Sequence, residues 1–415
     1  ALNMIYRYGI TEDEAYAQKV YPYLRGVADF WEKDLVCRDG VYHVVGDGMH
    51  ERTDGNIRDN GVPEDPVNTL GYLKTFFTWM PRISEALDLD EKKREKWLEI
   101  AENLAPYPKG TIREIQENPT LWKEVDVKLE DLLPEEMLDK EIYYDEGIGG
   151  KWSFHFPGNV MQIYPGNAIG LGSAPEELEV ARNTVQIHAL VENALGELEY
   201  RKALEEAEFA DKDNANNLLF NSNGELENGE AYSNGMESGG VKNPHFYKAG
   251  AFNASNLSCL FFTAAVRVGY APEIIWKEMR DMILNRGIPN GFLKENPHGI
   301  EQLNTIPDAI QEMMLQSCEG MIRIFPVWPR AEHPNAFFRN FRAWGGLEVS
   351  AALKDGEVER VSILSHKGHP CRVENPWPGK SVKVSYEYGR PDEVHFGEYL
   401  NIELYKEEHA ELFRI

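Results

Sequence analysis

Apolar residues recur at intervals of three or four over most of the first 325 positions, which is the spacing of amphipathic helices. The clearest example covers residues 67–87, where one face is formed by Leu70, Leu73, Phe77, Met80, Ile83 and Leu87. The same spacing predicts further helices over residues 15–35, 91–104, 175–190, 193–207, 251–268, 272–286 and 305–319. Many of these helices are paired through short connections, as in αα-hairpins.

The helix expected from residue 175 has a start signal and a turn before it. Ser173 and Glu176 have the S-x-x-E spacing of a capping box, with Pro175 in the first turn. The preceding Pro-Gly-Asn at 165–167 predicts a chain reversal, because proline presets φ and glycine or asparagine accepts positive φ. A loop held between two buried elements is a common place for a functional site.

After Phe325 the apolar period changes to two, which predicts antiparallel strands around Leu347, Val361, Val382 and Leu400. We therefore expect a helical domain over residues 1–325 and a small β-sandwich domain over residues 326–415. An aromatic run between them predicts that the two parts share a buried interface. This run consists of Phe325, Trp328, Phe337, Phe338, Phe341 and Trp344.

The composition excludes several classes of partner. The 415 residues carry a net charge of −26, which argues against nucleic acids, anionic membrane surfaces and strongly acidic polysaccharides as partners. The four cysteines are far apart, and neither a zinc constellation nor a nucleotide-binding or nucleophile-elbow motif is present. We expect no metal and no cofactor.

Aromatic residues beside polar ones point to carbohydrate. The chain has 9 Trp, 19 Tyr and 18 Phe, and stretches such as "KWSFHF" (151–156) interleave rings with hydrogen-bonding groups. Sugar rings offer apolar faces with polar rims, which such surfaces match. Ordinary core packing is the alternative for each ring taken alone.

Two glutamates are candidates for acid and base. Glu51 lies between His50 and Arg52 in a glycine-rich loop, a setting that suits an acid. Glu301 precedes a predicted helix, whose N-terminal N–H groups and dipole favour an ionised carboxylate suited to a base. A solvated loop acid and an ordinary helix-start acid are the alternatives.

Four segments together resemble a known family. They read "DLDEKKREKWLEIAENLAPYP" (88–108), "FPGNVMQIYPGNAIGLGSAPEELEVARNT" (156–184), "GIEQLNTIPDAIQEMMLQSCEGMIRIFPVWP" (299–329) and "FRAWGGLEVSAALKDGEVERVSILSHKGHPCRV" (341–373). In this order they resemble glycoside hydrolase family 95, the inverting α-L-fucosidases with some α-L-galactosidases. The resemblance extends from about Ala15 to Cys371.

The resemblance implies a mainly α fold, an (α/α)6-barrel-type helical toroid followed by a small antiparallel β domain. Too few helices are predicted for a closed ring of six hairpins, so the toroid is expected to be incomplete in this chain. A missing N-terminal part or a second polypeptide would complete the barrel. The Tyr164–Asn167 turn would then lie at the barrel mouth.

The resemblance also implies site residues. Glu51 would be the general acid and Glu301 the base, although the family has aspartate at the latter place. The substrate-binding set expected around them is His50, Arg52, Trp152, Phe156, Asn159, Tyr164, Asn253 and His298. The family's histidines before Tyr-Pro-Gly fall here at Phe154, Phe156 and Asn159, so the sugar is left open.

Two other functions remain open from the sequence. One is a polysaccharide lyase with an α/α toroid, for which His245, Tyr247 and Lys248 supply suitable groups. The other is a non-catalytic glycan-binding barrel. In each case the expected partner is a carbohydrate, with neither nucleic acid nor membrane bound. If a leader precedes Ala1, the periplasm or the extracellular space is favoured.

Overall fold

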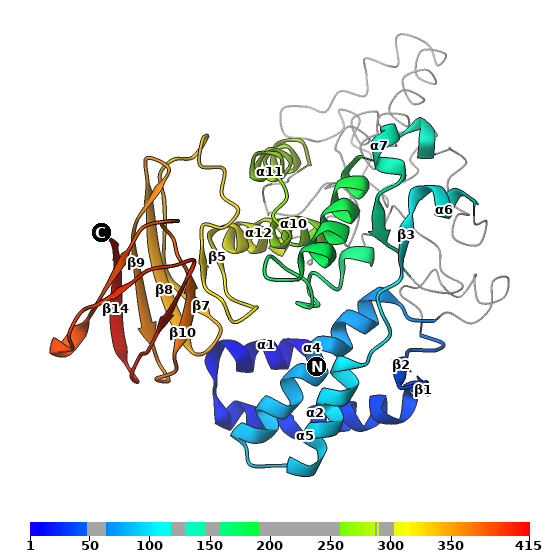
Figure 1. Ribbon diagram of the computed structural model, residues 1–415, viewed down its shortest axis with the longest axis horizontal. Helices are drawn as coiled ribbons and strands as arrows, with labels where there is room; N and C mark the ends of the chain where they lie inside the picture. The colour runs from blue at the N-terminus through cyan, green and yellow to red at the C-terminus, as the bar shows by residue number, and fades with distance from the viewer. Residues whose placement is uncertain (48–63, 118–128, 146–157, 191–257, 287–288, 290–302) are drawn as a thin grey trace, which may run out of the picture.

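The computed structural model describes residues 1–47, 64–117, 129–145, 158–190, 258–286, 289 and 303–415 (Figure 1). The structure is mixed, with 44% helix, 24% strand and a six-stranded antiparallel sheet. The expected mainly α fold with an (α/α)6-type toroid is therefore wrong. Apolar periodicity identifies single helices, but ring closure depends on contacts between distant helices that periodicity does not encode.

The N-terminal helices form their own core. They are α1 (Leu2–Thr11), α2 (Glu14–Asp34), α4 (Val67–Ala86) and α5 (Glu91–Glu102), and the last three confirm the predicted helices. Asp13 caps α2 by accepting the Tyr16 N–H at 3.1 Å. Trp97 on α5 is fully buried, and its indole N–H donates to Glu32 of α2 at 2.8 Å. This contact fixes the side-by-side packing of α2 and α5.

Short elements follow α2 and α5. They are β1 (Val36–Arg38), β2 (Val41–His43), β3 (Lys109–Thr111), α6 (Ile112–Glu117), η2 (Leu129–Asp131), α7 (Glu135–Leu138) and β4 (Glu141–Tyr143). β1 pairs with β2, and β3 pairs with β4, both antiparallel. The β1–β2 ladder lies between α2 and α4 in the chain, and the β3–β4 ladder lies between α5 and the second group of helices.

A second group of helices packs on the Tyr-Pro-Gly-Asn turn. It contains η3 (Gly158–Val160), a helix covering residues 175–190, α10 (Ser258–Arg267), α11 (Pro272–Arg286) and α12 (Thr305–Met314). The helix begins at Pro175 as predicted, but the capping box is wrong. The Ser173 hydroxyl instead accepts the Gly170 N–H at 3.1 Å, inside the preceding loop.

The C-terminal strands confirm the period-two pattern. The six-stranded sheet has the order β12 (Glu393–His395), β11 (Val382–Tyr386), β14 (Glu408–Arg414), β9 (Glu357–Ser365), β8 (Leu347–Lys354) and β7 (Ala336–Ala343). β10 (Cys371–Glu374) pairs separately with β13 (Tyr399–Ile402). Asp355 and Gly356 both have positive φ, as the tight β8–β9 turn requires.

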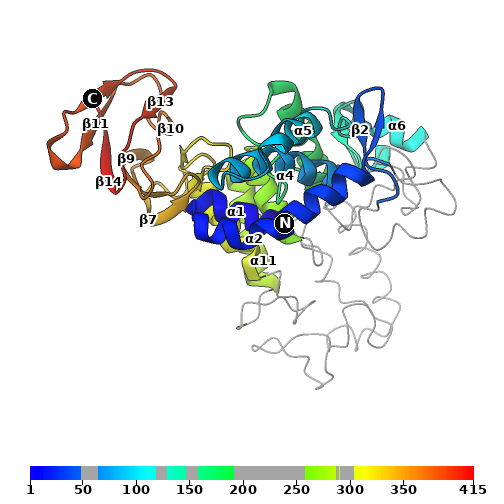
Figure 2. The ribbon, with the colours of Figure 1, turned by 90° about the horizontal axis from the view of Figure 1, so that it is seen from below.

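The second group of helices and the C-terminal strands share one continuous core. Phe325, Trp328 and Phe338 are buried at 1%, 7% and 3% exposure, and they belong to the same cluster as residues of α10, α12 and the sheet. The expected aromatic interface is confirmed for these three rings and wrong for Phe337, which is 64% exposed. Figures 1 and 2 show α1 beside the β7 end of the sheet.

α12 ends at Met314, earlier than the predicted 319, because Leu315 and Gln316 form strand β5. β5 pairs with β6 (Arg323–Ile324) across a turn in which Gly320 has a φ of 70°. This turn lies near the β10–β13 pair, since Ile322 bridges to Val373 of β10. Across the described residues, no helix is both long enough and apolar enough to span a bilayer.

Candidate functional site

The segment that carries Glu51 leaves and re-enters the described structure at a hydrogen-bonded stem. Val45 bridges to Glu64, and the Asp65 N–H donates to the Val44 carbonyl at 2.8 Å. On the other side of the stem, the Thr69 hydroxyl donates to Asp47 at 2.6 Å. Both ends of segment 48–63 are therefore tied to the first turn of α4.

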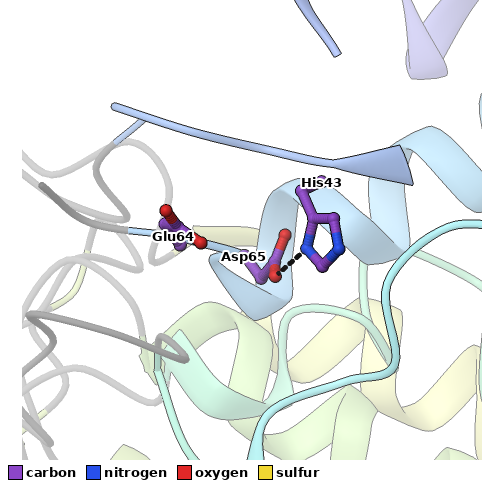
Figure 3. Close-up of side chains that lie close together, drawn as sticks. All are labelled: His43, Glu64 and Asp65. Carbon is purple, nitrogen blue, oxygen red and sulfur yellow. Dashed lines mark hydrogen bonds and ion pairs between the residues drawn. The ribbon is translucent and has the colours of Figure 1, made fainter. Parts of the chain in front are cut away.

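A histidine and two carboxylates lie together on this stem (Figure 3). His43 at the end of β2 points at Asp65, with 2.8 Å between Nδ1 and Oδ2, and the other oxygen of Asp65 accepts the Val44 N–H at 2.9 Å. Glu64 accepts two hydrogen bonds from the Arg38 guanidinium, at 2.8 and 3.1 Å.

The ligand atoms of His43, Glu64 and Asp65 lie within 4.8 Å of one another, which is close enough for a shared metal ion. Each carboxylate is already engaged, however, and a cation there would face the Arg38 guanidinium. The chemistry of this set is that of an ion-pair network, so we assign it the role of holding the stem.

A second chain end meets α4 at the same place. The Val67 N–H, in the first turn of α4, donates to the Asp145 carbonyl at 2.9 Å, and Asp145 is the last residue before segment 146–157. On the far side of that segment, Asn159 donates to the Tyr143 carbonyl at 3.0 Å. The described ends of the segments that carry Glu51 and Trp152 are thus neighbours at the start of α4.

Asn159 is held in a buried pair with His188. Their exposures are 0% and 1%, and His188 Nε2 donates to the side-chain oxygen Oδ1 of Asn159 at 2.7 Å. Burial lowers the pKa of His188 to about 3, so the imidazole is neutral at physiological pH. This geometry gives Asn159 the role of positioning the chain after Tyr143.

The Tyr164–Asn167 turn is fixed from two sides. The Tyr6 hydroxyl of α1 donates to the Pro165 carbonyl, and the Thr75 hydroxyl of α4 donates to the Gly166 carbonyl. Asn167 has a φ of 56°, which confirms the predicted left-handed position. Gly71 allows close approach, because a Cβ there would lie 2.6 Å from the Gln162 backbone.

A buried arginine supports the turn from below. Arg267 of α10 donates to the Ile163 carbonyl at 3.2 Å and pairs with Glu312 of α12 at 2.7 Å. Its guanidinium carbon lies 4.8 Å from the centre of the Tyr164 ring, and the Tyr164 hydroxyl donates to Asp308 at 3.1 Å. The arginine therefore connects two helices to the turn.

Two carboxylates one helical turn apart take part in these contacts: Asp308 with Tyr164, and Glu312 with Arg267. Burial raises the pKa of Asp308 above its usual value, opposed by the Tyr164 hydrogen bond and assisted by Glu312. Burial likewise raises the pKa of Tyr164, which stays protonated as a donor. The arrangement holds the half-buried Tyr164 ring in a fixed orientation.

Most of the predicted site residues lie outside the described residues. These are Glu51, Glu301, His50, Arg52, Trp152, Phe156, Asn253 and His298. Asn159 and Tyr164 are described, and they lie in neighbouring networks on either side of residues 160–163. Whether Glu51 and Glu301 face one another therefore stays a prediction.

Sequence reasoning missed Arg267, Asp308 and His188. The sequence does indicate a role for Arg267, because a lone arginine in the apolar run "FFTAAVRVGY" (261–270) needs a buried partner. The i, i+4 spacing of Asp308 and Glu312 places both on one helix face, which was a second signal. His188 had none, since a histidine within an apolar helix pattern is commonly a core residue.

No known family model matches this chain, and no curated protein matches it either.

Proposed function

We propose that this protein is a glycoside hydrolase that inverts the anomeric configuration, acting on an oligo- or polysaccharide with an α-L-fucoside-like or α-galactoside-like linkage. Glu51 is the proposed general acid, and Glu301 is the proposed base that activates a water. The proposal rests on the order of four family-like motifs along the chain.

One structural observation supports the proposal most directly. The Tyr164–Asn167 turn, which the resemblance places in the wall of the sugar pocket, is locked by Tyr6, Thr75 and Arg267 from three separate helices. A glycosidase needs its sugar-contacting groups held in place before the substrate arrives, because the ordering cost is then not taken from transition-state binding.

The stem of segment 48–63 supplies a second support. Asp47 and Asp65, at the two ends of this segment, are fixed by bonds to Thr69, His43 and Val44. A catalytic acid carried on a loop requires that both ends of the loop be fixed in this way. An inverting pair also needs room for a water, with about 6.5–9.5 Å between the carboxyl groups.

The test is turnover of a panel of aryl glycosides and oligosaccharides by the purified chain. We expect reducing sugar to be released, and Glu51→Gln and Glu301→Gln to lower kcat by orders of magnitude. Glu95→Gln, on the exposed face of α5, is the matched control and should be unchanged.

The other outcomes identify the competing functions. An unsaturated product that absorbs in the ultraviolet would show a polysaccharide lyase. Saccharide binding with no turnover would show a glycan-binding protein. Turnover that neither substitution affects would support hydrolase activity but show that Glu51 and Glu301 have no part in its mechanism.

A further inference from the structure

A polar pocket of about 400 Å³ lies between α4, the Tyr164–Asn167 turn and the sheet domain. Its wall contains the rings of Trp79 on α4 and Trp344 after β7, whose centroids are 4.8 Å apart and tilted by 54°. Both indoles are half-buried. The volume and the mixed aromatic and polar wall are those of a small-ligand site.

The indole of Trp344 is seated against α1 through a glycine. A Cβ at Gly9 would lie 2.5 Å from the Trp344 ring, and the Gly345 N–H donates to the Gly9 carbonyl at 2.8 Å. The aromatic wall is therefore held in place by the contact between α1 and the sheet domain, without needing a ligand to order it.

Three cations line the same pocket, and none has a carboxylate partner within the described residues. Each instead lies over an aromatic ring: Lys74 over Tyr107 at 5.7 Å, Arg82 over Trp79 at 4.9 Å, and Arg372 over Tyr399 at 4.4 Å. A guanidinium stacked on a ring keeps its in-plane N–H groups available for hydrogen bonds.

Two carboxylates line the pocket wall, and one of them is paired with a cation. Glu319 accepts the Gly172 N–H at 3.0 Å and pairs with Arg323, while Glu12 lies 2.8 Å from His369 and its Oε2 atom is buried without a hydrogen-bond partner among the described residues. With Glu12 counted against Lys74, Arg82 and Arg372, the charge that faces a ligand is net positive, in a protein whose net charge is −26. Remote acids do not cancel it, because salt screens charges beyond about 8 Å at physiological ionic strength.

A second, more apolar pocket of about 580 Å³ adjoins the first. The two share Lys74 and Thr78, and Arg82 continues the same face of α4 at the next i+4 position. Tyr107 and Tyr143 line the second pocket. Both pockets therefore have aromatic residues in their walls beside Lys74, which suits a chain of sugar units.

We propose that the pocket of Trp79, Trp344, Lys74, Arg82 and Arg372 binds a carboxylate-bearing sugar unit, a uronic acid, within an oligosaccharide. The planar carboxylate fits the guanidinium forks, and the sugar ring fits the indole wall. The saccharide part of this assignment rests on the proposed function, whereas the anion part rests on the pocket alone. It revises the expectation that acidic polysaccharides are excluded.

The test is calorimetric titration of the full chain with α-1,4-linked trigalacturonate. Its methyl ester is the matched neutral ligand, a sulfated trisaccharide is the alternative anion, and acetate and sulfate are the free ions. We expect the trigalacturonate to bind at least tenfold more tightly than its ester, and added salt to weaken this preference.

The variant Arg82→Gln/Arg372→Gln should weaken trigalacturonate binding by at least tenfold. The control Arg280→Gln/Arg360→Gln removes two exposed charges elsewhere and should bind like the wild type. Thermal unfolding of both variants establishes that they are folded. Equal binding of the acid and its ester, equal binding by the two variants, or tighter binding of free sulfate than of any saccharide overturns the proposal.

This outcome is separable from that of the proposed function. Trigalacturonate binding without hydrolysis of any glycoside would support the uronate pocket and contradict the hydrolase function. Hydrolysis of a glycoside with no preference for the charged trisaccharide would support the hydrolase function and contradict the uronate pocket. A preference for the sulfated trisaccharide over the uronate would contradict the carboxylate assignment.

Discussion

Replacing Glu312 by glutamine tests whether the Arg267–Glu312 pair holds the Tyr164 turn. The side chains are only 6% and 21% exposed, so the substitution leaves a buried guanidinium without its counter-charge. Breaking a buried pair in this way costs about 3–5 kcal/mol. We expect the lower end, about 3 kcal/mol, because the glutamine amide can still accept a hydrogen bond from Arg267.

An exposed pair in the neighbouring helix provides the control. Lys277 and Asp281 of α11 are 2.8 Å apart, with exposures of 66% and 40%. Asp281→Asn should therefore cost no more than about 0.5 kcal/mol. Urea unfolding followed by tryptophan fluorescence measures both free energies. If Glu312→Gln costs as little as Asp281→Asn, Arg267 is solvated and does not support the turn as described.

Three further predictions concern packing and titration. Gly71→Ala should destabilise the protein by about 1–3 kcal/mol, since its Cβ meets the Gln162 backbone, while Gly26→Ala, with open space around it, should be neutral or stabilising in thermal unfolding. The pKa of His188 is lowered in the folded state, so its contribution to the free energy of unfolding is present above pH 6.5 and is lost as the pH falls towards 3, at up to about 1.4 kcal/mol per pH unit. His188→Gln should flatten this dependence of stability on pH. The pKa of Asp308 is raised in the folded state, so its contribution to the free energy of unfolding is lost as the pH rises. Asp308→Asn should therefore stabilise the protein more at pH 7 than at about pH 3, and the opposite order would contradict the burial of this carboxyl.

The sequence predicted local elements well. The periodicity over α4, the boundaries of α11 and the alternation in β8 are each determined by a face that must be buried, and that information is local. The end of α12 was missed because Leu315 pairs with Ile324 across a turn. The toroid was wrong for a related reason, since closure depends on how distant helices meet.

The candidate site was predictable only in part. The chain reversal at 165–167 follows from residue types, but its supports do not. Tyr164 and Asp308 are 144 positions apart, and Tyr6 and Pro165 are 159 apart. The cations of the further pocket are equally non-local, because Arg82 and Arg372 line one pocket only when the sheet domain packs against α4.

We propose that this chain hydrolyses a glycosidic bond with inversion through Glu51 and Glu301. The most direct measurement is proton NMR of the first-formed sugar during turnover of the best substrate in the panel. An inverting mechanism predicts a product of inverted anomeric configuration, formed by the wild type and by Glu95→Gln but absent with Glu301→Gln. A product of retained configuration, or equal turnover by Glu301→Gln, would contradict it.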